Sequence, residues 1–178
     1  MSAGGVGLRS LAVNFPREVR TNDHWREHHP AMVAGQTDRF VASALAHRVA
    51  RNELEGGDVV PVGNLTPRRD FTDVRDVVRA YRLLVVHGHP GEVYNVCSGH
   101  DVAVAELAEQ LVQLAERPMR LEADPALQRP VDIPVLRGDN TRLRTATGWT
   151  PEIPLHQTLA DLLDHWRTVV APAPAPSA

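Results

Sequence analysis

Two adjacent arginines precede a helix-forming stretch in "TPRRDFTDVRDVVRAYRLL", residues 66–84. Neighbouring like charges do not stabilise each other, so Arg68 and Arg69 need solvent, acidic partners or an anionic ligand. One interpretation is local: Asp70 and Asp73 pair with the arginines, and the helix dipole favours acids at the first turn. The other is an anion site, because a guanidinium group matches two phosphate oxygens at once. Spacing alone favours the local ion pairs.

A second stretch, "LQRPVDIPVLRGDNTRL", adds an arginine and a carboxylate. It places Arg129 before a proline and Asp132 three residues later. Pro130 and Pro134 restrict the preceding residues to extended conformations, which stiffens the loop. A rigid arginine near a carboxylate suits a nucleotide, because the guanidinium can bind the diphosphate while the acid accepts ribose hydroxyls. A surface turn with its own ion pair is the simpler explanation of this loop taken alone.

The elements that would position these residues alternate between helices and strands. Apolar periodicity predicts four long helices, at residues 37–54, 73–87, 102–116 and 156–170. A short helix is expected between Asn140 and Gly148, and Asp101 is the expected N-cap of the third long helix. Stretches rich in β-forming residues predict strands, at residues 58–63, 91–99 and 118–124. This alternation indicates an α/β layered unit.

The helix over 73–87 carries an apolar stripe opposite a wet side of arginines. Six residues at helical spacing form the stripe: Val74, Val77, Val78, Tyr81, Leu84 and Val85. Such a stripe is typical of a helix that packs on a core.

Composition restricts the classes of partner and compartment. The chain has 178 residues and a formal net charge of −3, so we expect no nucleic-acid partner and no membrane surface. Cys97 is the one cysteine, which excludes an internal disulfide and suits a reducing, cytoplasmic location. We interpret Cys97 as a packing residue, because no partner for thiolate activation appears near it in the sequence. All nineteen basic residues are arginine, so no lysine is available for chemistry.

Three histidines near the start of the sequence are candidate metal ligands. His24 and His28 have the i, i+4 spacing that places two ligands on one helical face, and His29 follows directly. The segment shows no helical pattern, so a solvated loop is the preferred interpretation and no metal is expected.

Four motifs occur in a fixed order: "VGNLTPRRDFTDVRDVVRAYRLL", "GEVYNVCSG", "RPVDIPVLRGDNTRLRTATGW" and "PEIPLHQTLADLLDHW". Together they resemble the C-terminal substrate-binding lobe of extended short-chain dehydrogenases/reductases that act on nucleotide sugars. Within that superfamily the similarity is greatest to the GDP-mannose 4,6-dehydratase and GDP-4-keto-6-deoxymannose reductase families. The resemblance covers residues 35–170 and includes "GQTDRFVASALAHRVA".

The resemblance implies roles for four residues. Arg69 and Arg129 would contact the diphosphate of a GDP-sugar, and Asn64 would lie in a turn near the nucleotide. Asp132 stands where the family carries an acid, often glutamate, that contacts the nucleotide. Arg68 would face solvent or Asp70.

Two features that the family needs for hydride chemistry are missing from this sequence. Its NAD(P)-binding Rossmann half carries a glycine-rich phosphate loop after a strand, whereas "SAGGVGL" precedes the only nearby strand candidate. Its Tyr-x-x-x-Lys pair needs a lysine, and positions +4 from Tyr81 and Tyr94 are Val85 and Ser98. We therefore expect no catalytic residues and no cofactor bound by this chain alone.

These observations predict three segments: an irregular one at 1–35 with a possible strand at 7–15, a nucleotide-sugar lobe at 36–170, and a disordered Pro/Ala tail at 171–178. Three functions stay open. The chain is the substrate-binding part of a nucleotide-sugar dehydratase, reductase or epimerase, associated with a Rossmann half; or a non-catalytic binding or dimerisation module; or a truncated remnant. An apolar surface should be left exposed where a Rossmann half would pack.

Overall fold

The computed structural model describes residues 40–128 and 133–172. Their elements follow in the order α3 (Val41–Glu55), β1 (Val59–Val62), β2 (Arg68–Asp70), α4 (Val74–His87), β3 (Asp101–Ala103), α5 (Val104–Gln113), β4 (Arg120–Ala123), the 3-10 turn η1 (Pro125–Leu127), β5 (Val135–Leu136), α6 (Thr141–Thr147) and α7 (Leu155–Val170). The predicted α/β class is confirmed. The expected segment at 1–35 and most of the expected tail lie outside the described residues. No helix within the described ranges is long and apolar enough to cross a membrane.

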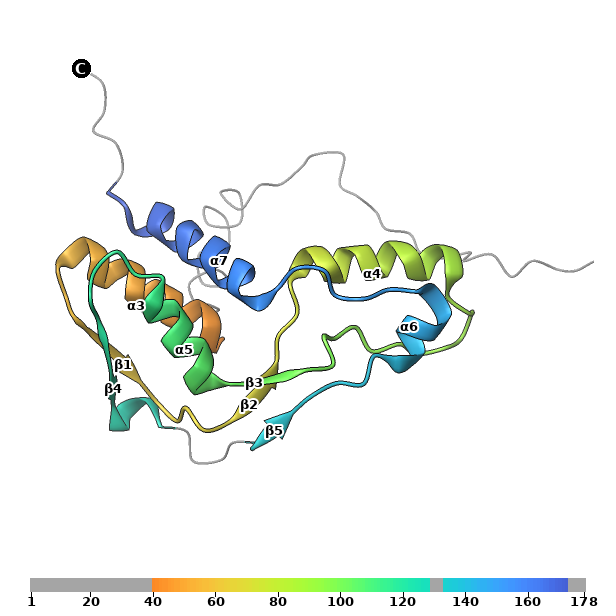
Figure 1. Ribbon diagram of the computed structural model, residues 1–178, viewed down its shortest axis with the longest axis horizontal. Helices are drawn as coiled ribbons and strands as arrows, with labels where there is room; N and C mark the ends of the chain where they lie inside the picture. Colours follow the sequence, from red (N-terminus) through yellow and green to blue (C-terminus); the bar gives the residue numbers. More distant parts are fainter. Residues whose placement is uncertain (1–39, 129–132, 173–178) are drawn as a thin grey trace, which may run out of the picture.

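The larger core lies between a helical layer and a two-stranded parallel sheet. Helices α3, α5 and α7 pack on one another beside β1 and β4 (Figure 1). Successive side chains of β1 point to opposite faces of the sheet, so Val60 and Val62 are buried while the neighbouring residues of the strand are partly exposed. The fully buried residues of this core are apolar: Leu45, Ala46, Val49, Ala50, Val60, Val62, Leu107, Ala108, Leu111, Leu159 and Leu163. Helix α3 ends where the sequence predicted, at Gly56, whose φ of 85° suits a residue without a Cβ.

A second sheet of three short strands has the order β3-β2-β5. Strand β2 pairs antiparallel with β3, placing Arg69 opposite Val102, and parallel with β5, placing Arg69 opposite Leu136. The sequence did not predict these three strands, because each has only two or three residues and too few side chains for a period. Pairing with the neighbouring segments, rather than local propensity, makes them strands.

Helices α4 and α6 form the other end of the molecule around a smaller core (Figure 1). Ala80, Leu143 and Trp149 are fully buried there, and partly buried apolar residues pack against them: Leu83, Leu84, Tyr94 and Val96. Two acids at the start of α4 connect this end of the molecule to α7 and to the segment just before it. Asp73 accepts a hydrogen bond from Thr158 of α7 at 2.8 Å, and Asp76 accepts from the amides of Glu152 and Ile153 at 3.0 Å.

Three predictions about these elements were wrong. Residues 91–99 form no strand, because no strand of the described chain pairs with them. Asp101 is not a helix cap: α5 begins after Ala103, and Asp101 pairs with Arg68 from within β3. The apolar stripe of α4 is mostly exposed: Leu84 packs against the smaller core, but four of its six residues are exposed, Val74 the most at 70%.

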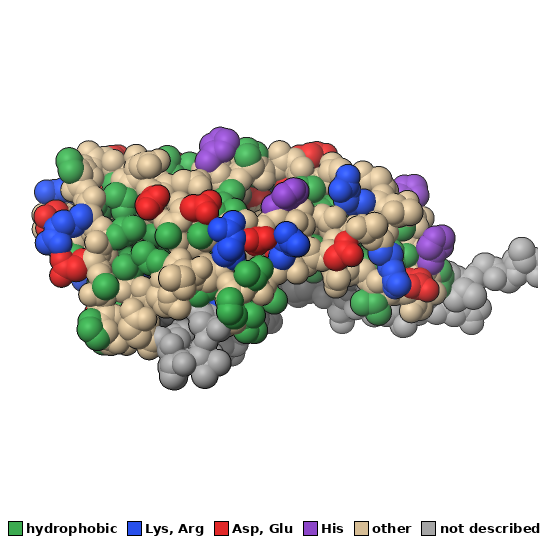
Figure 2. All heavy atoms as spheres, turned by 60° about the horizontal axis from the view of Figure 1, so that its bottom comes forward, with side chains coloured by type: hydrophobic (Ala, Val, Ile, Leu, Met, Phe, Trp, Pro, Cys, Tyr) green, Lys and Arg blue, Asp and Glu red, His purple; other side chains and the backbone are tan. Residues whose placement is uncertain are grey.

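Apolar and charged side chains are distributed unevenly over the strand side of the molecule. Figure 2 shows apolar side chains gathered towards the end that carries β1 and β4, charged side chains at both ends, and histidine side chains from the middle towards the other end.

Candidate functional site

Strand β2 directs its two arginines to different partners, because successive side chains point to opposite faces of a strand. Arg68 contacts the Asp101 carboxylate through Nε, and its Nη1 lies 3.3 Å from Glu106 Oε1. The hydrogen bond from Arg68 also holds the pKa of Asp101 below its usual range. The expected alternative of a pairing between Arg68 and Asp70 was therefore wrong, while the Arg68 side chain remains 41% exposed to solvent. Its guanidinium group holds β2 to β3 and α5.

The Arg69 side chain lies on the side of β2 that faces the segment just before β5. Its Nη1 donates to the carbonyl oxygens of Arg68 at 2.8 Å and Ile133 at 2.7 Å. The Arg68 amide donates to the Pro134 carbonyl at 2.8 Å, so two successive residues of β2 hold the start of β5. Two other expected site residues, Arg129 and Asp132, lie outside the described residues. The structure does place Ile133, the residue that follows them, against the Arg69 guanidinium group.

Asn64 stabilises the turn between β1 and β2. Its Oδ1 accepts hydrogen bonds from the Thr66 amide at 3.0 Å and from Thr66 Oγ1 at 2.9 Å. The preceding Gly63 allows a close approach, because a Cβ there would overlap the carbonyl oxygen of Leu127. The turn that carries Asn64 consequently lies against the chain two residues before Arg129.

Asp70 organises the site in a way that the sequence interpretation missed. Its carboxylate accepts from the amides of Ser98 and Gly99, both at 2.9 Å, from Ser98 Oγ at 2.6 Å and from the Gly138 amide at 3.2 Å. Backbone amides, not arginines, are thus its partners. The turn glycines in "CSG" and "RGD" were the available signal, since both present amides to this acid.

Asp73 does not neutralise Arg68 or Arg69 either. Its side chain caps α4 by accepting from the Arg75 amide at 2.8 Å, and it also pairs with the Arg75 guanidinium group. The Arg75 hydrogen bonds hold the pKa of Asp73 far below its usual range, although burial acts in the opposite direction. The local-pairing interpretation of residues 68–73 was therefore wrong for both acids.

Cys97 lies in a packed contact beside this network. A Cβ at Gly138 would overlap the Cys97 sulfur, so the two residues fit only because one is glycine. Burial raises the pKa of the Cys97 thiol, and the nearby Asp70 charge adds to the effect. A protonated thiol is a poor nucleophile, which supports a packing role. Asn140 closes the contact by donating Nδ2 to the Cys97 carbonyl at 2.9 Å.

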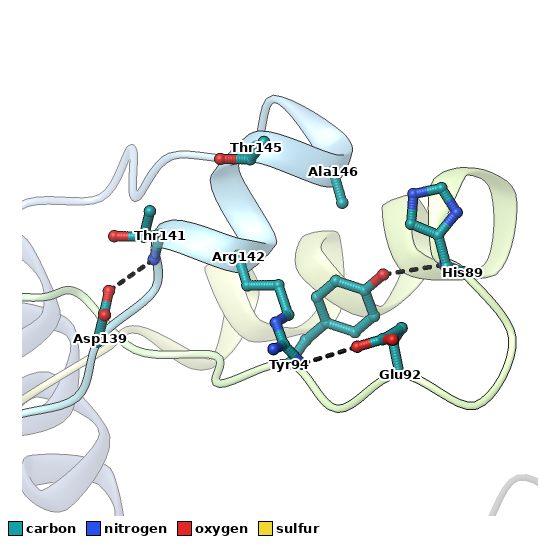
Figure 3. Close-up of a pocket in the computed structure, with 8 residues that line it drawn as sticks. All are labelled: His89, Glu92, Tyr94, Asp139, Thr141, Arg142, Thr145 and Ala146. Atoms are coloured by element: carbon teal, nitrogen blue, oxygen red, sulfur yellow. Dashed lines mark hydrogen bonds and ion pairs between the residues drawn. The ribbon is translucent and has the colours of Figure 1, made fainter.

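A separate open cavity of about 610 Å³ lies between α6 and the chain after α4 (Figure 3). Its charged and polar side chains satisfy one another: Arg142 pairs with Glu92 at 2.7 Å, and Tyr94 Oη accepts from the His89 amide at 2.9 Å. Asn64 and Arg69, the two expected site residues that the structure describes, do not line it. The cavity was not predicted from the sequence, because its lining comes from two segments about fifty residues apart.

Neither tyrosine of the chain is paired with a lysine, because the sequence contains no lysine. Tyr81 and Tyr94 are the two tyrosines of the chain. Tyr81 is 58% exposed on α4, and the Tyr94 hydroxyl is held by His89. No group of three His, Cys, Asp or Glu side chains that could hold a metal occurs among the described residues. His24, His28 and His29 lie outside them.

Comparison with known proteins identifies the family. The model of the GDP-mannose 4,6 dehydratase family matches residues 30–162. The GDP-6-deoxy-D-mannose reductase of Pseudomonas aeruginosa is 40% identical over 143 residues, which are 76% of this chain and 45% of the reductase. The chain belongs to the GDP-mannose 4,6-dehydratase family. Its fold is therefore that of the extended short-chain dehydrogenases/reductases, as the sequence motifs implied.

Other family relatives and solved structures agree. GDP-mannose 4,6 dehydratase 2 of Caenorhabditis elegans is 24% identical over 76% of this chain and 39% of its own length. The structure of RMD from P. aeruginosa complexed with NADPH superposes with a TM-score of 0.69 at 39% identity, over 76% of this chain and 45% of RMD. A putative epimerase from Burkholderia cenocepacia J2315 gives a TM-score of 0.63 at 35% identity, over 75% of this chain and 43% of the epimerase. The chain spans less than half the length of these relatives.

Proposed function

We propose that this chain is the nucleotide-sugar-binding part of an enzyme of the GDP-mannose 4,6-dehydratase or GDP-4-keto-6-deoxymannose reductase type. Arg69 and Arg129 bind the diphosphate of a GDP-sugar, and Asn64 and Asp132 contact the nucleotide. The observation that carries this proposal is the position of Arg69, whose guanidinium group is held by the Ile133 carbonyl. That contact joins Arg69 to the residue directly after the segment that contains Arg129, the other expected diphosphate ligand, and Asp132.

The chemical steps of the family belong to residues outside the described site. RMD was solved with NADPH, so a nicotinamide cofactor serves at least this relative. In the present chain no lysine is available to lower the pKa of a tyrosine. We therefore expect this chain alone to bind a GDP-sugar weakly, with a Kd of about 1 mM, because much of the pocket wall is supplied elsewhere. A Rossmann half that supplies NAD(P) would complete the enzyme.

Titration of GDP into the purified chain, followed by ligand-observed NMR, tests the proposal. A charge-assisted hydrogen bond contributes about 1.5–3 kcal/mol, so Arg69→Ala should weaken GDP binding about ten- to a hundredfold. GMP, which lacks the second phosphate, should bind more weakly than GDP to the unsubstituted chain, and it should also bind weakly to Arg69→Ala. Arg68→Ala is the matched control, since Asp101 and Glu106 already occupy that guanidinium group.

Arg69→Lys separates charge from geometry, because an ammonium group keeps the charge but cannot form a two-pronged contact. We expect it to retain part of the affinity. Equal losses in the Arg68 and Arg69 variants, or affinity for GMP equal to that for GDP, would refute the assignment of Arg69 to the diphosphate.

A further inference from the structure

We infer that Asp70 is a positioning residue for diphosphate binding: its carboxylate fixes strand β5 against β2 and thereby sets the orientation of the Arg69 guanidinium group. The inference deepens the proposed function and rests on it for the identity of the ligand. Its structural part, the attachment of β5 to β2, can be tested without a ligand.

The acceptor positions of the Asp70 carboxylate are occupied by the protein itself. A carboxylate offers about four lone-pair sites on its two oxygens. Oδ1 accepts from the amide and the hydroxyl of Ser98, and Oδ2 accepts from the amides of Gly99 and Gly138. Any contribution of Asp70 to nucleotide binding therefore acts through the segments that it holds.

The donors to Asp70 come from both neighbours of β2. Ser98 and Gly99 precede β3, whereas Gly138 follows β5, so one carboxylate bridges the two strands that flank β2. Asn140 joins the same two segments to each other, since its Nδ2 donates to the Ser98 carbonyl at 3.0 Å. Asp70 attaches this joined unit to the end of β2.

Strand β5 depends on such polar contacts because it buries little apolar surface. Its two residues are 52% and 57% exposed. Before β5 the Arg68 amide donates to the Pro134 carbonyl at 2.8 Å, and after it the Gly138 amide donates to Asp70 at 3.2 Å. So short a strand gains little from burial, and loss of one of these attachments should therefore let it move.

The position of β5 determines the surroundings of Arg69. Arg69 Nη1 donates to the carbonyl of Ile133, two residues before β5, at 2.7 Å. A guanidinium group binds phosphate oxygens through paired hydrogen bonds of fixed geometry, so its orientation affects the affinity. A side chain that is already held in the binding geometry also loses less conformational entropy when the ligand binds. Release of β5 from Asp70 therefore weakens diphosphate binding by Arg69.

The charge of Asp70 predicts a change of the opposite sign. Asp70 is next to Arg69 in the sequence, and a negative charge near a diphosphate opposes its binding. A neutral replacement should strengthen GDP binding if Asp70 acts through its charge, and should weaken GDP binding if Asp70 acts through position. The direction of the change thus separates the two roles.

GDP titration and hydrogen exchange of the full chain test the inference. Asp70→Asn keeps the shape of the side chain but replaces one acceptor oxygen by an NH₂ donor, so the contacts of that oxygen are lost. We expect the Kd for GDP, measured by ligand-observed NMR, to rise about tenfold. The Arg68 amide, which reports on the contact between β2 and the start of β5, should exchange at least about tenfold faster.

Asp70→Glu keeps both acceptor oxygens on a side chain that is longer by one methylene group. It should therefore recover part of the GDP affinity and part of the Arg68 protection that Asp70→Asn loses. If Asp70→Asn does not fold, Asp70→Glu is compared with the unsubstituted chain, and we expect weaker GDP binding and faster Arg68 exchange than in that chain.

Asp73→Asn is the matched control, because it makes the same change of residue and charge three positions away. Asp73 accepts from the Arg75 amide and the Thr158 hydroxyl, both at 2.8 Å, and these partners lie on α4 and α7. This variant should lower the free energy of unfolding but leave the Kd for GDP and the Arg68 exchange rate within about twofold of the unsubstituted chain. A general loss of stability would instead change both variants alike.

Three results would overturn the inference: an Arg68 exchange rate unchanged by substitution of Asp70, a Kd for GDP that is unchanged or lower in Asp70→Asn, or equal effects of the Asp70 and Asp73 variants. If the unsubstituted chain binds no GDP, the proposed function is contradicted together with the role of Asp70 in GDP binding. The Arg68 exchange rate then decides separately whether Asp70 attaches β5 to β2.

Discussion

Asp76 provides a sharp test of how the α4 end of the molecule is held together. Its side chain is 2% exposed, and its carboxylate accepts from Arg79 at 2.6 Å and from the amides of Glu152 and Ile153 at 3.0 Å. Asp76→Ala removes a charged acceptor and leaves two amides unpaired. Removing one partner of a buried ion pair costs about 3–5 kcal/mol. Because Arg79 also contacts Glu152 at 2.9 Å, it keeps a partner, and we expect the free energy of unfolding to fall by about 3 kcal/mol.

Urea unfolding followed by tryptophan fluorescence measures this loss. Trp149 donates its Nε1 to the Asp76 backbone carbonyl at 3.0 Å, so its emission reports on the right region. With an m-value of about 1–3 kcal/mol per molar urea, the midpoint should fall by about 1–3 M. Asp164→Ala is the matched control, since Asp164 also pairs with an arginine three residues away at 2.6 Å but is 69% exposed. That variant should lose less than about 1 kcal/mol. Similar losses in the two variants would refute the reasoning from burial.

Three further predictions concern the pH dependence of stability, the contact between Gly138 and Cys97, and cofactor binding. Asp73 and Asp76 have pKa values below their usual range, so their ionised forms stabilise the fold at neutral pH. The free energy of unfolding should therefore fall as the pH drops below about 4, and it should fall less steeply in Asp76→Ala. Urea midpoints measured at several pH values will show this difference. Gly138→Ala should lower the free energy of unfolding by about 1–3 kcal/mol through its overlap with Cys97, and Cys97→Ala should relieve part of the loss in a double-mutant cycle. The chain alone should neither bind NADPH at micromolar concentration nor turn over GDP-mannose, and micromolar binding by calorimetry would contradict the assignment of cofactor chemistry to residues outside it.

Much of the fold could be predicted because its longer elements carry their own periodicity. Helices α3, α4 and α7 lie where apolar residues recur at helical spacing, and β1 and β4 lie within predicted strands. The α5 helix begins two residues later than expected and ends at Gln113. The helix begins later because Asp101 belongs to β3, where it pairs with Arg68, a partner thirty-three residues away.

The candidate site was predictable in its residue types but not in its pairings. The sequence indicated that Arg68 and Arg69 need anionic or acidic partners, and the motif order identified the family. It assigned Asp70 and Asp73 to the arginines because those acids are nearest along the chain. In the folded protein, successive side chains of β2 point to opposite faces, which separates the two arginines. The amides of Ser98, Gly99 and Gly138 donate to the Asp70 carboxylate in place of an arginine.

The features that could be inferred without the fold are therefore local and compositional: amphipathic helices, turn glycines, an arginine-only set of cations and a family signature. Tertiary structure alone decided which charges meet and which apolar stripe stays exposed. The physical reason is that ion pairs and strand pairs depend on distances across the fold, whereas helical periodicity depends on neighbours three and four residues away. The apolar stripe of α4 shows the limit most clearly, since its spacing is the same whether the stripe is buried or exposed, and only the packing of its neighbours distinguishes the two.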